Sequence, residues 1–171
     1  MARGVAAFSH IAVSVSNLDL AADFYCSGLG FGPGDEYSAA GCEVAAIMGV
    51  PRTGFRGTFL RLGVTLLELL EYREALPKSA WPRDPREVGY AHISLIVPDM
   101  HEAVDNALRH GGAFCAQLDH AFGGGQETTI TFLRDPDGNR IELIFHPNSE
   151  ETRAHSNFLG IGAIGWPADV V

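Results

Sequence analysis

Two histidines and two glutamates stand at matching places in this chain. His10 and His92 each open a His-Ile step, in Phe-Ser-His-Ile-Ala-Val and Tyr-Ala-His-Ile-Ser-Leu. Further along each copy, Glu68 and Glu142 lie within Leu-Glu-Leu-Leu and Ile-Glu-Leu-Ile. Imidazole nitrogens and carboxylate oxygens are common ligands of divalent metals. The chain therefore contains an internal repeat of one unit. The four residues predict a metal site on a pseudo-twofold axis.

The four residues lie in apolar stretches that are typical of β-strands. Because side chains alternate along a strand, Glu68 shares a face with Leu66 and Leu70, whereas Glu71 should point away from it. Burying a polar group without a partner in such a row costs roughly 2 to 7 kcal/mol, and a charge costs more. A shared cation would supply that partner.

Arg140 is the charged neighbour of Glu142 on the same predicted strand face. Two roles are open for it from the sequence. It could meet a carboxylate or phosphate of a substrate, or it could form a salt bridge at the strand end.

The first copy, residues 6–72, has the order βαβββ. Ser16 and Asn17 offer a helix N-cap, and Gly28 and Gly30 offer a stop. The predicted strands occupy residues 6–15, 34–47, 55–62 and 64–72.

The second copy, residues 89–146, repeats this order. Asp99 with Glu102 forms a capping-box pattern at the start of a helix over residues 100–110. The predicted strands occupy residues 89–97, 113–117, 126–133 and 139–146. Residues 73–88 are expected to link the copies, and residues 147–171 to form an apolar, irregular tail.

Composition narrows the class of protein. The net charge of -9, without a basic cluster, argues against nucleic acid or an anionic membrane as partner and favours a small-molecule substrate. Three scattered cysteines indicate reduced thiols rather than a disulfide framework. No signal peptide or long apolar run is present, so we expect a cytoplasmic protein.

Several segments together resemble a known superfamily. They are His-Ile-Ala-Val from residue 10, Asp-Phe-Tyr from 23, Leu-Glu-Leu-Leu-Glu-Tyr from 67, Gly-Tyr-Ala-His-Ile from 89 and Phe-Leu-Arg-Asp-Pro-Asp-Gly-Asn-Arg-Ile-Glu-Leu from 132. In this order they resemble the vicinal oxygen chelate superfamily, which includes glyoxalase I, methylmalonyl-CoA epimerase, extradiol dioxygenases and fosfomycin-resistance proteins.

The resemblance covers residues 6–146 as one domain and implies an α+β fold. Two tandem βαβββ modules would form an open, U-shaped, eight-stranded mixed sheet around one divalent ion of nickel, cobalt, manganese, iron or zinc. The ligands it implies are His10, Glu68, His92 and Glu142. Members of the superfamily are commonly dimers, so the resemblance also implies a homodimer.

The four-ligand set is similar to the glyoxalase I and epimerase branch. The function expected is a metal-dependent isomerase or epimerase that chelates neighbouring oxygens of a small substrate and moves a proton next to a carbonyl. By sequence, Glu68 and Glu142 are equivalent candidates for the base.

Three alternatives accompany this expectation. One is a lactoylglutathione lyase of the glyoxalase I type, and another is a metal-free binding or resistance protein. A ring-cleaving extradiol dioxygenase is the least favoured. The resemblance implies that those enzymes have no protein ligand to the metal at the position that Glu68 occupies here. The substrate has no recognisable signature in the sequence.

Overall fold

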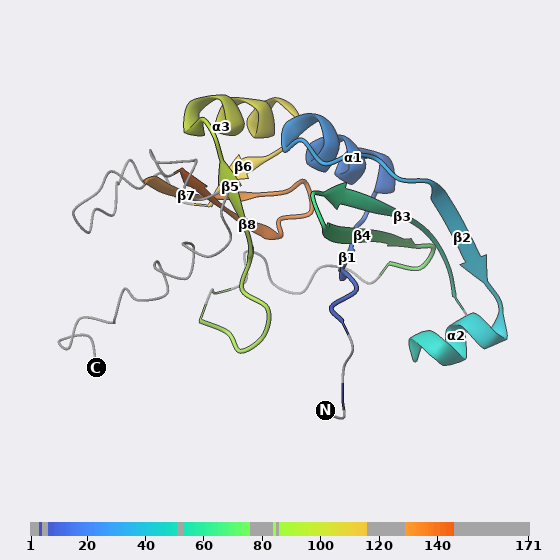
Figure 1. Ribbon diagram of the computed structural model, residues 1–171. Coiled ribbons are helices and arrows are strands. Elements are labelled where there is room, and N and C mark those ends of the chain that lie inside the picture. Colours follow the sequence, from blue (N-terminus) through green and yellow to red (C-terminus); the bar gives the residue numbers. More distant parts are fainter. Residues whose placement is uncertain are drawn as a thin grey trace.

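The structure is a computed structural model that describes residues 4, 7–50, 53–75, 84, 86–115 and 129–145 (Figure 1). The predicted tail over residues 147–171 and most of the predicted linker lie outside the described residues. The described strands are β1 (Ile11–Ser14), β2 (Glu36–Ala40), β3 (Gly54–Leu62), β4 (Thr65–Tyr72), β5 (Ile93–Val97), β6 (Ala113–Phe114), β7 (Thr129–Arg134) and β8 (Arg140–Phe145). The described helices are α1 (Leu18–Asp23), the π-helical turn η1 (Phe24–Gly28), α2 (Cys42–Met48) and α3 (Met100–Arg109).

The strands form two four-stranded sheets with the same topology. The order is β1-β4-β3-β2 in the first and β5-β8-β7-β6 in the second. In each sheet the first strand runs parallel to the last strand of its module, and the other pairs are antiparallel. The α+β fold of two repeated βαβββ modules is thus confirmed. In the described part of the chain the two sheets are separate, with no ladder that joins them into one.

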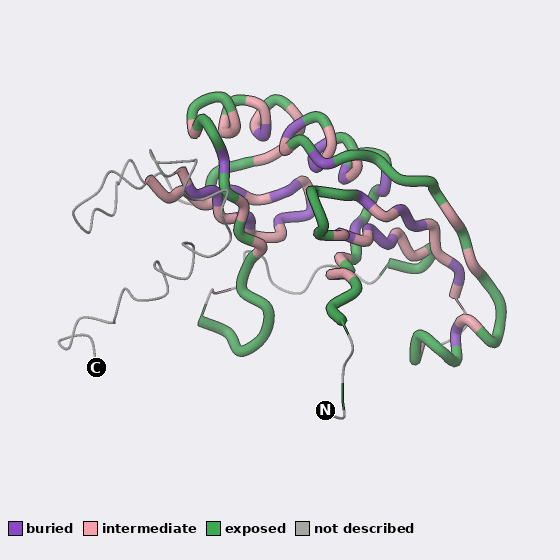
Figure 2. The backbone as a smooth tube through the Cα atoms, viewed as in Figure 1, coloured by how far each residue is buried: buried purple, intermediate pink, exposed green. Residues whose placement is uncertain are grey.

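Helices cover one face of the sheets. α1 and α3 lie side by side above the strands (Figure 1), and buried residues gather on the strand segments beneath them (Figure 2). In β4 the buried core residues Leu67 and Leu69 alternate with the half-buried Glu68. The same alternation places Ile141 and Leu143 in the core of β8. The opposite sheet face is therefore the one that carries Glu68 and Glu142.

The predicted helix caps are present. The side chain of Asn17 accepts a hydrogen bond from the backbone N–H of Leu20 at 3.0 Å, and that of Asp99 accepts one from Glu102 at 3.0 Å. These caps begin α1 and α3 at the predicted positions. In the described residues, no helix is long and apolar enough to cross a membrane.

The prediction of one strand over residues 34–47 is wrong. Only its first part is a strand, β2, and the chain then turns at Gly41 into the helix α2. Ala45 is the buried residue of α2, and Gly49 ends the helix in the left-handed conformation. The apolar residues of this segment follow a helical turn and do not alternate, which the prediction did not recognise.

The two modules meet through η1, α3 and the turn that joins β7 to β8. The hydroxyl of Tyr25 donates a hydrogen bond to Asp135 at 3.1 Å, and both residues are buried. The backbone N–H of Ser16 donates to Asp137 at 3.0 Å. A Cβ atom at Gly28 would lie 3.3 Å from the Cβ atom of His110, so η1 and α3 approach closely there. This junction fixes how the second module sits on the first.

Candidate metal centre

The first module brings His10 and Glu68 together. β1 and β4 run parallel, and Ala12 of β1 stands opposite Glu68. His10 lies just before β1, and its Nε2 atom is 3.2 Å from Oε2 of Glu68. The histidine side chain is 34% exposed and the glutamate side chain 13%, so the pair is reachable from solvent. The Nδ1 atom of His10 is hydrogen-bonded to the hydroxyl of Ser9 at 2.9 Å, which leaves Nε2 facing Glu68.

The second module repeats this arrangement. β5 and β8 run parallel, and Nε2 of His92 lies 3.4 Å from Oε2 of Glu142. The two side chains are 34% and 16% exposed, nearly the same as in the first pair. The internal repeat therefore extends to the geometry of the predicted ligands.

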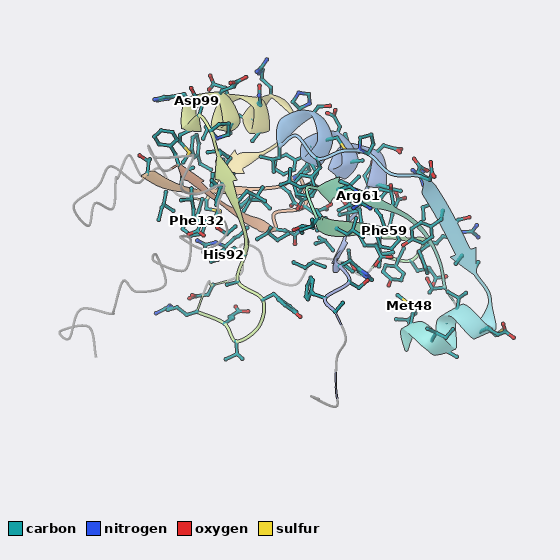
Figure 3. All side chains as sticks on the ribbon, viewed as in Figure 1. Met48, Phe59, Arg61, His92, Asp99 and Phe132 are labelled. Atoms are coloured by element: carbon teal, nitrogen blue, oxygen red, sulfur yellow. The ribbon has the colours of Figure 1, made fainter. Side chains whose placement is uncertain are left out.

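Each histidine also meets a phenylalanine from the central antiparallel pair. Phe59 stands opposite Glu68, and Phe132 stands opposite Glu142. The rings of His10 and Phe59 are edge-on at 5.3 Å between centroids, as are the rings of His92 and Phe132. Figure 3 shows His92 and Phe132 close together on one sheet, well apart from Phe59 on the other. Each module thus holds one set of these three residues, a His-Glu-Phe half-site.

The half-sites differ in how the glutamate is held. In the first module the hydroxyl of Tyr37 donates a hydrogen bond to Oε1 of Glu68. Burial, and then the hydrogen bond to Glu68, raise the pKa of Tyr37 above its ordinary value, so the phenol stays protonated and remains a donor. In the second module the hydroxyl of Ser94 donates to Oε2 of Glu142 at 2.6 Å.

Sequence reasoning did not find Tyr37, Ser94, Phe59 or Phe132. Ser94 and the two phenylalanines could be found from strand parity, because each lies on a neighbouring strand on the same face as its glutamate. Tyr37 lies two strands from Glu68, and no spacing in the sequence brings these two residues together.

Glu71 lies on the opposite face of β4, as predicted. Its Oε2 atom accepts a hydrogen bond from the backbone N–H of Leu18 at 2.8 Å. This carboxylate satisfies an open donor at the start of α1, so Glu71 belongs to the helix side of the sheet and not to the half-site.

The predicted ligands are gathered as two pairs. Among the described residues, no group of three or more histidine, cysteine, aspartate or glutamate side chains is placed to hold a metal. Each half-site nevertheless presents an imidazole nitrogen and a carboxylate oxygen toward each other, which suits two adjacent positions of a divalent ion. One chain supplies two such pairs. A centre with four ligands requires a His10–Glu68 pair to face a His92–Glu142 pair.

Comparisons with known proteins agree with the fold. Residues 7–143 match the sequence profile of the glyoxalase/bleomycin resistance protein/dioxygenase superfamily. The lactoylglutathione lyase of Neisseria meningitidis serogroup A is 27% identical over 152 residues, which cover 85% of this chain and 95% of that enzyme. The lactoylglutathione lyase of Escherichia coli O157:H7 is 39% identical over 66 residues, which cover 37% of this chain and only about half, 47%, of that enzyme.

A solved structure shows the same fold. The crystal structure of a glyoxalase family protein from Bacillus cereus superimposes with a TM-score of 0.73 at 16% identity. The superposition covers 84% of this chain and 96% of that one.

Proposed function

Because this chain belongs to the glyoxalase/bleomycin resistance protein/dioxygenase superfamily, we propose that it is a divalent-metal-dependent enzyme of the isomerase or epimerase type. Its substrate would be a small molecule with two neighbouring oxygens, and its reaction a proton transfer next to a carbonyl. The observation that carries this proposal is the repeated half-site, in which Nε2 of a histidine faces Oε2 of a glutamate at 3.2 Å and 3.4 Å.

The complete centre, in this proposal, is shared between two copies of the chain. His10 and Glu68 of one protomer would face His92 and Glu142 of the partner subunit, and a homodimer would contain two such centres. The support is that the described part of one chain holds two pairs and no group of three. Two imidazoles and two carboxylates would leave up to two positions of an octahedral ion for the substrate.

A bound divalent ion would supply Lewis-acid stabilisation of the negative charge that develops on the substrate oxygens. The protein groups would divide the remaining work. Glu68 is engaged through both oxygens, by Tyr37 at Oε1 and beside His10 at Oε2, so it would act as the fixed ligand. In Glu142 both contacts fall on Oε2, and Oε1 makes no hydrogen bond to a described residue.

This difference makes Glu142 the better candidate for the base. Its Oε1 atom can take a proton from the substrate carbon and return it, while Ser94 keeps the carboxylate oriented through Oε2. An epimerase would return the proton to the opposite face of the same carbon, and a lyase of the glyoxalase type would return it to the neighbouring carbon.

The second candidate function is that of a lactoylglutathione lyase. The names of the relatives favour it, since one such enzyme aligns over 85% of this chain. The hemithioacetal of methylglyoxal with glutathione is the substrate that would distinguish this function from an epimerase.

The test begins with metal content. Protein purified without an affinity tag and analysed by mass spectrometry should contain about one divalent ion per chain. Glu68→Ala and Glu142→Ala should each lose most of the metal. Glu71→Gln, on the opposite face of β4 from Glu68, should retain the metal. Absence of metal in the wild type, even after soaking with nickel, cobalt, manganese and zinc, would favour a metal-free binding protein.

The sharing of the centre has its own test. One variant carries His10→Ala with Glu68→Ala, and a second carries His92→Ala with Glu142→Ala. Each alone should bind no metal, but after mixing and subunit exchange about a quarter of the sites should be intact, because half of the dimers are mixed and each has one complete centre. If each centre were built within one chain, mixing would restore nothing.

A further inference from the structure

The two modules differ next to the half-sites in one pair of residues. Two positions beyond the Phe59–Glu68 pair, Arg61 stands opposite Leu66. At the equivalent place beyond the Phe132–Glu142 pair, Arg134 stands opposite Arg140. The second module therefore has two arginines directly across an antiparallel pair where the first has an arginine and a leucine.

Arg140 lies on the half-site face. Its guanidinium carbon is 4.6 Å from the centroid of the Phe132 ring, whose edge contact with His92 places all three side chains on one surface. Stacking on a ring uses the flat face of a guanidinium and leaves its N–H donors free in the plane.

Neither arginine is neutralised by a carboxylate among the described residues. Arg134 donates one hydrogen bond, from Nη2 to the backbone oxygen of Phe114 at 2.8 Å. The Nε atoms of Arg134 and Arg140 are both buried and without a hydrogen-bond partner in this part of the chain. The strand-end salt bridge that the sequence left open for Arg140 is therefore not formed with a described residue.

Both positive charges reach the same neighbourhood. Burial raises the pKa of the Cys115 thiol, and the charges of Arg140 and Arg134 oppose that rise. Like charges directly opposite each other on a sheet repel, so this pair destabilises the fold unless an anion lies between them. The two arginines face each other in a chain of net charge -9, which has an excess of acidic residues.

We propose that Arg134 and Arg140 form an anion subsite that binds a carboxylate or phosphate group of the substrate. The proposal rests on the proposed function, because it places this group beside the centre that contains Glu142. Arg140 lies two residues from Glu142 along β8, a separation of about 7 Å. The substrate would then be a small acid or phosphate ester whose anionic group is a few bonds from its chelating oxygens.

Anion binding can be measured without metal or turnover. The probes are inorganic phosphate and propionate, added separately to chelator-treated protein labelled with ¹⁵N-arginine, while the Nε–Hε resonances of the arginines are recorded. Arg134→Gln and Arg140→Gln assign the two resonances and remove one cation each. Arg61→Gln, at the equivalent place in the first module, is the matched control.

A saturable shift of the Arg134 and Arg140 resonances is expected with at least one probe. Affinity should fall about tenfold or more in Arg140→Gln and Arg134→Gln, because each removes charge-assisted hydrogen bonds. Arg61→Gln should change it less than twofold. The stronger probe identifies the anionic group as phosphate or carboxylate.

Shifts that are linear in probe concentration, or equal to those of Arg61, would overturn the subsite. Metal content of Arg140→Gln, measured in parallel, should match the wild type. Absence of a saturable anion effect in wild-type protein that binds metal refutes this inference alone, and absence of metal in wild-type protein that shows the anion effect refutes the proposed function alone.

Discussion

The phenol of Tyr37 donates a hydrogen bond to Oε1 of Glu68 across the intervening strand β3. The tyrosine ring passes over Gly57, its register partner, and stacks on Phe59 with 5.6 Å between centroids and 16° between planes. A Cβ atom at Gly57 would lie 2.7 Å from the ring carbon Cζ and the hydroxyl of Tyr37. The missing side chain of Gly57 is therefore what lets Tyr37 orient Glu68.

Tyr37→Phe should weaken metal binding while leaving the fold intact. Groups that orient a metal ligand contribute about 10- to 100-fold in affinity, so we expect a loss of at least about tenfold. Competition with a chromophoric chelator measures the affinity, and the visible spectrum of the cobalt-loaded protein reports a change in ligand geometry.

Tyr72→Phe is the matched control for this substitution. Tyr72 lies on the same strand face as Glu68, and burial and the Glu68 charge raise its pKa, but it makes no hydrogen bond to that carboxylate. Equal affinities in the wild type and Tyr37→Phe would contradict the orienting role.

Gly57→Ala should destabilise the protein by about 1 to 3 kcal/mol, the usual cost of overpacking. The added methyl group would also lie 3.0 Å from the backbone oxygen of Leu69, so the strand as well as the ring must shift. Urea unfolding followed by circular dichroism measures the change. Gly32→Ala is the control, because its nearest neighbour would be an ordinary contact at 3.5 Å. Equal losses of stability in the two variants would show that the packing of the Tyr37 ring over Gly57 does not require a glycine there.

Local patterns predicted the parts of the fold that depend on neighbours in sequence. Asn17 and Asp99 cap their helices as expected, and alternation correctly placed Glu71 away from Glu68. Parallel pairing of the first and last strands of each module then brings each histidine to its glutamate. The matching positions of these residues in the two copies had indicated that they would meet.

Features that depend on distant segments were not predictable in this way. The contact of Tyr25 with Asp135 joins the two modules, and periodicity carries no information on how modules pack. The prediction that all four ligands meet assumed an arrangement of the sheets that strand parity cannot supply. The role of Gly57 likewise depends on a ring from another strand.

Glu71→Ala should lower the free energy of unfolding by about 1 kcal/mol, because the backbone N–H of Leu18 loses its carboxylate acceptor at the start of α1. Glu71→Gln keeps an oxygen acceptor and should lose less. Urea unfolding measures both changes. The metal content of both variants should equal that of the wild type, and a loss of metal would place Glu71 functionally with Glu68.

Asp23 and His110 link the two modules in a way that should make stability depend on acid pH. Oδ2 of Asp23 lies 2.8 Å from Nδ1 of His110, the residue that also approaches Gly28 of η1. The hydrogen bond from His110, and then that from Ser27, lower the pKa of Asp23 in the folded protein. An aspartate in the unfolded chain has a pKa of about 3.9, so between the two values the unfolded chain binds more protons.

The contribution of Asp23 should therefore be fully present above about pH 4 and be lost as the pH falls through its lowered folded value. Urea unfolding of the wild type and Asp23→Asn, compared from pH 6 to pH 3, should show a stability difference that shrinks toward acid pH. Asp105→Asn on α3 is the control, because the carboxylate of Asp105 forms no ion pair with a described residue. A difference between wild type and Asp23→Asn that stays constant down to pH 3 would show that the His110 contact does not stabilise the charged carboxylate.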